Sequence, residues 1–265
     1  MGVAGKVALI TGGCGGLGEA FAEVLLKRGA KVCLVDLNSN QGEEVEQQFS
    51  KTYGKSVVFQ QCDVTDKQAL EDAFRFTKDT FGRLDIVANN AGITDEVNWE
   101  KQIAVNLTAV VRGTYLGLDY MRKDKGGHGG VIINTASMAG LIPMFTTPVY
   151  SATKHGVVGL SRAVGSDARF PKQHVRCNAL CLSFANTNML SGKHEDENIN
   201  EIMQVVVAVT GVLEPTTVAE GFLRLVEDET LNGEVMRVTS QKGIDIKEYP
   251  RSETLKLPPE MISKL

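Results

Sequence analysis

The chain has little proline, a single tryptophan and no surplus of positive charge. Its 265 residues include 7 prolines, and 28 basic residues stand against 32 acidic ones, which gives a net charge of −4. The low proline content and the 43% of hydrophobic residues exclude a disordered or collagen-like chain. The missing basic surplus argues against a nucleic-acid partner. Apolar runs stay far below the roughly 20 residues that cross a bilayer, so we expect no membrane span.

Cysteine is also scarce. The five cysteines are scattered and form no CxxC pair: Cys14, Cys33, Cys62, Cys177 and Cys181. Zinc sites and dithiol redox sites require paired spacing, so we predict no metal site. The pattern indicates free thiols in a reducing compartment, which makes the cytoplasm the default location.

The last three residues point to a different compartment. Ser263, Lys264 and Leu265 form the triplet that the peroxisomal import receptor reads. Prolines and charges before the triplet predict an exposed C-terminal tail, 249–265. We therefore expect peroxisomal import through that receptor, with a chance match and a cytoplasmic location as the alternative.

Short apolar runs alternate with longer amphipathic segments along the chain. The runs predict strands at 7–10, 32–35, 57–59, 86–88, 131–133, 175–181 and 235–238. The amphipathic segments predict helices at 17–28, 70–81, 103–121, 150–168 and 216–227. This alternation is typical of an α/β fold with right-handed crossovers and a parallel sheet that helices cover on both faces. Because no linker or repeat divides it, we expect one domain over 1–248.

The segment 183–214 interrupts the alternation. Its front part, 191–198, is polar, whereas 202–212 is apolar. The combination suits a lid whose apolar part closes over a hydrophobic ligand. The alternative is a surface helix packed on the body of the domain.

A glycine-rich turn, 11–18, stands between the first predicted strand and the first predicted helix. Glycines there allow a pyrophosphate to approach the backbone, and the helix N-terminus attracts the anion. Asp36 ends the second strand, where a carboxylate accepts the ribose hydroxyls of NAD and repels the additional phosphate of NADP. The pattern predicts an NAD site, although Asp36 could instead cap a helix or a turn.

Four other residues suggest proton-transfer chemistry. Tyr150 and Lys154 lie one helical turn apart on the same helix face, and an ammonium lowers the pKa of a neighbouring phenol. Ser137 follows the fifth strand and could hold a substrate oxygen. Asn106 is a poor helix former inside a predicted helix, where a buried amide needs a partner. Taken alone, a Tyr-Lys pair at this spacing is more often an exposed helix pair.

The glycine turn, Asn89-Asn90-Ala91-Gly92, Ser137 and the Tyr150/Lys154 pair occur together and in one order. This set resembles the short-chain dehydrogenase/reductase family over 5–238. The resemblance implies a single-domain Rossmann-type, doubly wound parallel sheet of about seven strands, and a homodimer or homotetramer that pairs through the helices at 103–121 and 150–168. It also implies a catalytic tetrad of Asn106, Ser137, Tyr150 and Lys154.

The same resemblance implies which residues hold NAD. They belong to the glycine turn, the acid after the second strand, the turn after the third strand and the segments near the nicotinamide: Gly12, Gly16, Leu17, Gly18, Asp36, Leu37, Cys62, Asp63, Val64, Asn90, Tyr150, Lys154, Ala185, Asn186 and Thr187.

Three runs, 98–101, 113–121 and 148–150, resemble family members that oxidise a secondary hydroxyl on a lipid. Leu182-Ser183 departs from the Pro-Gly of the family, and we expect Ser183 to strain a position suited to glycine and weaken cofactor binding. Thr147 and Thr210 replace a glutamine and a tyrosine of those relatives, whereas Phe184 matches their aromatic residue. The substrate contacts implied are Ser137, Thr147, Tyr150, Phe184 and Thr210.

The sequence thus predicts an NAD-dependent oxidoreductase acting on a secondary hydroxyl of a small, hydrophobic, lipid-like molecule. A carbonyl reductase of the same family is an alternative, because the reaction is reversible. A second alternative is an NAD-binding scaffold or sensor with little turnover, which the altered Leu182-Ser183 turn suggests.

Overall fold

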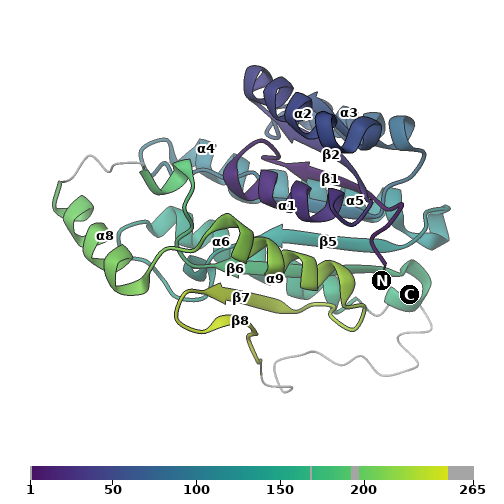
Figure 1. Ribbon diagram of the computed structural model, residues 1–265. Coiled ribbons are helices and arrows are strands. Elements are labelled where there is room, and N and C mark those ends of the chain that lie inside the picture. The colour runs from purple at the N-terminus through teal and green to yellow at the C-terminus, as the bar shows by residue number, and fades with distance from the viewer. Residues whose placement is uncertain (1, 168, 192–196, 250–265) are drawn as a thin grey trace, which may run out of the picture.

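One eight-stranded sheet organises the chain in its computed structural model, which describes residues 2–167, 169–191 and 197–249 (Figure 1). The strand order is β3-β2-β1-β4-β5-β6-β7-β8. The strands are β1 Val7–Thr11, β2 Lys31–Asp36, β3 Val57–Gln61, β4 Ile86–Asn89, β5 Gly130–Thr135, β6 Val175–Leu182, β7 Val235–Thr239 and β8 Gly243–Ile246. The first seven run parallel, which confirms the predicted doubly wound sheet, and β8 adds an antiparallel edge strand that we did not predict.

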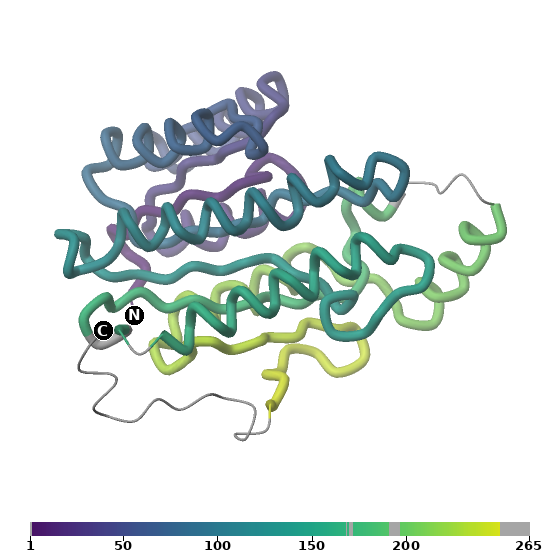
Figure 2. Tube along the Cα trace, turned by 180° about the vertical axis from the view of Figure 1, so that it is seen from behind, coloured from purple at the N-terminus to yellow at the C-terminus, as the bar shows by residue number. Residues whose placement is uncertain are grey.

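Helices cover both faces of this sheet. Alternate strand residues point to opposite faces, so Ala8 and Ile10 pack with one set of helices while Val7 and Leu9 pack with the other. The first set is α1 Gly16–Leu26, α2 Ser39–Tyr53 and α9 Pro215–Glu227. The second set is α3 Lys67–Phe81, α5 Val110–Met121 and α6 Pro148–Gly165, and α4 Trp99–Ile103 packs against α6. Figure 2 shows this second face, with α5 and α6 side by side.

Two helices differ from the sequence predictions. Helix α2 was not predicted, because it buries only Gly42, Val45 and Phe49 and its apolar pattern is therefore sparse. The helix predicted at 103–121 begins earlier, at Trp99, and contains a π-helical segment, Ala104–Ala109, between α4 and α5. Single π turns inside helices are frequent at functional sites, and this one carries Asn106.

A buried polar cluster fixes α5 and α6 against the middle of the sheet. The Asn134 Oδ1 atom on β5 accepts a hydrogen bond of 2.8 Å from the Asn89 amide on β4. The Asn134 amide donates to Ser161 Oγ on α6 at 3.0 Å, and Thr114 on α5 donates to Asn134 Oδ1 at 3.2 Å. Because each buried polar group has a partner, the cluster holds the two helices in one arrangement without an unpaired group.

Helix α8, Glu197–Thr210, lies beyond the carboxyl ends of the parallel strands (Figure 1). None of its described side chains is buried, and Met203 contacts the loop before α6 through a 3.4 Å hydrogen bond from Thr146. The polar residues 192–196 and the tail 250–265, with Ser263, Lys264 and Leu265, lie outside the described residues. No helix in the described part of the chain is long and apolar enough to span a bilayer.

Candidate active site

The glycine turn leads from β1 into α1 at the carboxyl edge of the sheet. Gly15 is the N-cap of α1 and has no side chain to bond the first-turn N–H groups, which are therefore open to an anion. Gly12 and Gly18 lie so close to neighbouring backbone that no side chain fits at either position. A Cβ on Gly18 would lie 2.1 Å from the Gly12 carbonyl oxygen, and one on Gly12 would lie 2.9 Å from Ala91 Cα. Only glycine therefore fits at these two positions of the predicted phosphate turn.

The Asp36 carboxylate is held at the end of β2. Its Oδ2 atom accepts a 3.1 Å hydrogen bond from the Cys14 backbone N–H, and its Oδ1 atom accepts one of 3.2 Å from Asn38. These bonds orient the carboxylate beside the glycine turn, at the place where an adenosine ribose would lie. Asp36 does not cap α2, since Asn38 caps that helix, but its bond from the Asn38 N–H fits the alternative role as a turn residue.

Two other predicted cofactor residues already have partners within the chain. The Asn90 amide donates to the carbonyl oxygens of Thr11 and Gly12 at 3.1 Å each. It therefore ties β4 to the glycine turn. The Asp63 Oδ1 atom accepts from the Thr65 hydroxyl at 2.7 Å, yet Asp63 remains exposed and open to a ligand. Cys62 and Val64, which flank Asp63 in the chain, are buried, and Leu37, which follows Asp36, is exposed.

Tyr150 and Ser137 meet at the same edge. Ser137 caps the short turn after β5, where its hydroxyl accepts a 3.1 Å hydrogen bond from Ala139 N–H. Burial raises the pKa of Tyr150 to about 12, and a hydrogen bond with the Ser137 side chain opposes that rise. The sequence led us to expect a lowered phenol pKa. In the chain alone the pKa is raised instead, because loss of solvent is the largest effect.

Lys154 is one turn of α6 further on and is only 3% exposed. Its ammonium donates a 2.8 Å hydrogen bond to the carbonyl oxygen of Thr135, the last residue of β5, and lies 5.5 Å from the Tyr150 ring centroid. Burial lowers the pKa of Lys154 to about 8. A Tyr-Lys pair exposed on a helix surface, the alternative that the sequence left open, is thereby excluded.

Asn106 is fully buried in the π-helical segment and lies near Lys154. Its amide exchanges two hydrogen bonds of 2.8 Å with the backbone of Ile93. A Cβ on Gly92 would lie 3.4 Å from Asn106 Oδ1 and 3.6 Å from Lys154 Nζ, so these two side chains share one small space. The predicted tetrad is therefore assembled around the carboxyl ends of β4 and β5.

The family model for short-chain dehydrogenases matches residues 6–198 of this chain. The chain belongs to the short-chain dehydrogenase family. This confirms the resemblance that the motifs indicated. The human 15-hydroxyprostaglandin dehydrogenase [NAD(+)] is 46% identical over 256 residues, which cover 94% of this chain and 96% of the relative. The mouse protein of that name is 45% identical, with 96% and 97% covered.

Two less similar proteins also match most of the chain. A 3beta-hydroxysteroid dehydrogenase 2 from Eggerthella lenta is 31% identical, with 89% of this chain and 94% of the relative covered. The crystal structure of levodione reductase superposes with a TM-score of 0.80 at 29% identity and covers 91% of this chain and 98% of the other.

The segment after β6 connects the tetrad to the glycine turn of this short-chain dehydrogenase. Just before this segment, Cys181 near the end of β6 makes a hydrogen bond with the Ser137 backbone. At the other end, the Thr187 methyl group would lie 3.2 Å from a Cβ on Gly16. The predicted cofactor contacts Ala185 and Asn186 lie on this segment, between the glycine turn and Tyr150.

Ser183 departs from the family within this segment, and its backbone is not strained. His174 is the one described non-glycine residue with a positive φ, so our expectation of strain at Ser183 is wrong. Among the described residues, the Ser183 hydroxyl is the one buried side-chain polar atom without a hydrogen-bond partner. Leaving such a group unpaired costs on the order of 1–3 kcal/mol, so the hydroxyl fits a ligand that carries a hydrogen-bonding group.

The three other predicted substrate contacts lie at the start of α6, at the end of α8 and just after β6. Thr147 is the N-cap of α6 but makes no side-chain cap bond. The Thr210 hydroxyl donates to the Val206 carbonyl oxygen of its own helix at 2.8 Å. Phe184 is partly buried, and its carbonyl oxygen accepts from Leu213 N–H at 2.8 Å.

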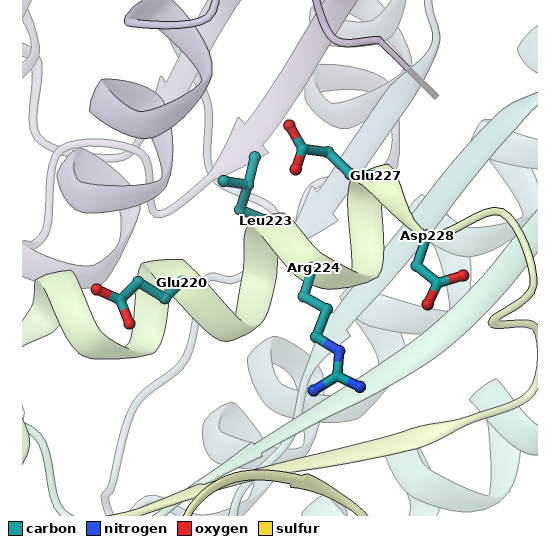
Figure 3. A pocket seen from close by; sticks show the side chains of 5 residues that line it. All are labelled: Glu220, Leu223, Arg224, Glu227 and Asp228. Atoms are coloured by element: carbon teal, nitrogen blue, oxygen red, sulfur yellow. The ribbon is translucent and has the colours of Figure 1, made fainter.

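A separate hollow lies along α9, away from these groups (Figure 3). The residues lining it are Glu220, Leu223, Arg224, Glu227 and Asp228. Since α9 runs back toward the amino ends of the parallel strands, the hollow opens at the edge opposite the tetrad. Across the described ranges, no three His, Cys, Asp or Glu side chains gather closely enough to hold a metal ion.

Lys154→Met tests the buried charge through the pH dependence of stability. The pKa of Lys154 falls from 10.5 to about 8 on folding, so below pH 8 both states are protonated and the folded state bears the full desolvation cost. Between pH 8 and 10.5 the folded chain loses its proton first, and wild-type stability rises relative to the variant by on the order of 3 kcal/mol. Urea unfolding of both proteins across this range measures the difference, and a constant difference contradicts the buried charge.

Ser183→Ala tests whether a bound cofactor satisfies the unpaired hydroxyl. Removing the hydroxyl should raise the free energy of unfolding of the ligand-free chain by about 1 kcal/mol and weaken NADH binding about 5- to 10-fold. Urea unfolding and NADH fluorescence titration measure the two effects. An NADH dissociation constant within twofold of wild type shows that the hydroxyl does not face the cofactor.

Proposed function

We propose that this chain is an NAD-dependent dehydrogenase that oxidises a secondary hydroxyl on a hydrophobic, lipid-like substrate. The observation that carries the proposal is the buried Lys154, whose ammonium lies beside the Tyr150 ring at the edge that also holds the glycine turn. The similarity to relatives named 15-hydroxyprostaglandin dehydrogenase [NAD(+)] supports both the cofactor and the class of substrate.

The cofactor preference follows from Asp36. Its carboxylate is oriented by two backbone N–H groups, and it would repel the extra phosphate of NADP while accepting ribose hydroxyls of NAD. The first-turn N–H groups of α1 would hold the pyrophosphate, and Lys154 would bind the nicotinamide ribose. When bound, oxidised NAD supplies the acceptor for the hydride that leaves the substrate carbon.

The proton of the substrate hydroxyl goes to Tyr150. With its pKa raised to about 12 by burial, Tyr150 needs positive charge nearby to act as a phenolate, and Lys154 provides one such charge. Ser137 holds the reacting oxygen by a hydrogen bond as the C–H bond breaks and the carbonyl forms. Asn106, which is held by the backbone of Ile93, would order a water that relays the proton outward.

Several exposed apolar side chains form a hydrophobic surface suited to a lipid. Ile142 and Phe145 lie in the loop before α6, and Met189 lies in the short turn that precedes α8. Helix α8 contacts the same loop through Met203 and Thr146. We infer that the segment 183–214 acts as the lid over this apolar surface, with Thr147, Phe184 and Thr210 toward the substrate.

The same residues could catalyse the reverse reaction. A carbonyl reductase would use Tyr150 as the proton donor, and the similarity to a levodione reductase favours keeping this direction in the test. A scaffold without turnover is less well supported, because the four tetrad residues are all present and adjacent.

Tyr150→Phe should reduce oxidation of hydroxylated fatty acids by about 100- to 10,000-fold, because the proton acceptor is lost. NADH absorbance with a panel of secondary-alcohol lipids, and its reversal with the matching ketones, measures both directions. Tyr53→Phe, at the last residue of α2 on the opposite face of the sheet, is the control and should keep the wild-type rate. Wild-type rates no higher than those of Tyr150→Phe in both directions would support the scaffold instead.

Two finer proposals concern assembly and location. We infer pairing of two or four copies through α5 and α6, as in the family, and note that Tyr115 is 57% exposed on α5. We also infer peroxisomal import of a chain that ends in Ser263-Lys264-Leu265. A fluorescent fusion that ends in this triplet should collect in peroxisomes, and the same fusion without the triplet should stay diffuse. Identical diffuse staining of both fusions contradicts import.

A further inference from the structure

Glu96 binds the start of the helix that carries Tyr150. Glu96 lies in the loop between β4 and α4, more than fifty residues earlier in the chain. Its Oε2 atom accepts a 3.0 Å hydrogen bond from Val149 N–H, and its Oε1 atom accepts one of 2.9 Å from Tyr150 N–H. One carboxylate therefore holds two consecutive backbone amides, one of which belongs to Tyr150 itself.

Helix α6 has no such partner of its own. The first N–H groups of a helix need acceptors from outside the helix, and the N-cap side chain usually supplies one. Here the N-cap, Thr147, makes no side-chain cap bond, and Pro148 has no N–H to donate. Glu96 thus supplies the missing cap from a distant part of the chain, and its negative charge suits the positive end of the helix.

The loop that carries Glu96 is itself held firmly. The Gln102 amide, which is fully buried, donates to Glu96 Oε1 at 3.0 Å, and Gln102 Oε1 accepts from Asp95 N–H at 2.7 Å. Three residues before Glu96, the backbone of Ile93 exchanges two hydrogen bonds with Asn106. A single short loop therefore connects Asn106 at one end with the backbone of Tyr150 at the other.

We propose that Glu96 is a positioning residue for the reaction, which sets the place of the Tyr150 phenol relative to Ser137 and Lys154. The proposal rests on the proposed role of Tyr150. Without the carboxylate, two first-turn N–H groups lose their acceptor and the first turn of α6 can shift or fray. A displacement of about 1 Å at a reacting group can cost on the order of 100-fold in rate.

Backbone amide exchange and steady-state kinetics of Glu96→Ala and Glu96→Gln test the proposal. Exchange at Val149 and Tyr150 should be about 10- to 100-fold faster in Glu96→Ala, since bonds to a charged acceptor are lost. The kcat should fall by a similar factor, with the NADH dissociation constant within about twofold of wild type. Glu96→Gln keeps one acceptor oxygen and should fall between Glu96→Ala and wild type. Its shape matches that of glutamate, so it keeps the test open if the alanine variant does not fold.

Glu100→Ala is the matched control. Glu100 is exposed in the first turn of α4, and the variant removes the same charge close by in the chain. Wild-type exchange and kcat in Glu100→Ala show that contact rather than charge matters, and a shared loss of kcat in both variants contradicts positioning. The pH at which kcat/KM reaches half its plateau should stay unchanged in Glu96→Gln, because geometry rather than the phenol pKa is altered.

The two proposals can fail separately. If Tyr150→Phe keeps wild-type turnover, the role of Tyr150 is wrong, whereas faster exchange at its amide in Glu96→Ala still reports the cap. If Tyr150→Phe is inactive and Glu96→Ala keeps kcat within twofold, Tyr150 is catalytic and Glu96 does not position it. Unchanged amide exchange in Glu96→Ala overturns the cap itself.

Discussion

A lysine ammonium buried at the carboxyl end of β5 is the constraint on which the site depends. A charge with 3% exposure needs strong acceptors, and Lys154 has the carbonyl oxygen of Thr135. That bond requires α6 to lie close against the strand end. The turn after β5 is equally close, because a Cβ on Gly140 would lie 2.6 Å from the Lys154 carbonyl oxygen. This packing brings Ser137 beside Tyr150.

The surrounding structure keeps this arrangement before any ligand binds. The Asn134 cluster holds α6 against the sheet through Ser161, and Glu96 holds the first turn of α6 through the Tyr150 N–H group. Asn90 connects the glycine turn to β4 in the same way, and Asp36 is oriented by two backbone amides. Functional groups held by a second layer of hydrogen bonds lose little freedom on binding, which is how a site becomes selective as well as active.

Sequence reasoning succeeded where the signal was local. The glycine turn, the seven parallel strands and the Tyr150/Lys154 spacing each occupy a few consecutive residues, and apolar strands buried on both faces are easily recognised. It failed where an element buries few apolar residues or where the partners lie far apart in the sequence. Helix α2 has too few apolar residues to show its period, and the short strand β8 follows from pairing with β7. The Glu96 cap left no signal at all, because its partners lie more than fifty residues away.

The sequence by itself therefore determined the fold class and the family and predicted the site residues, because these depend on side-chain types at fixed local spacing. Only the tertiary structure decided their electrostatic state. Burial, which is a property of the whole packed chain, raises the pKa of Tyr150 and lowers that of Lys154. The tertiary structure also decided that Ser183 has an unpaired hydroxyl and an unstrained backbone, since hydrogen-bond partners come from segments that folding brings together.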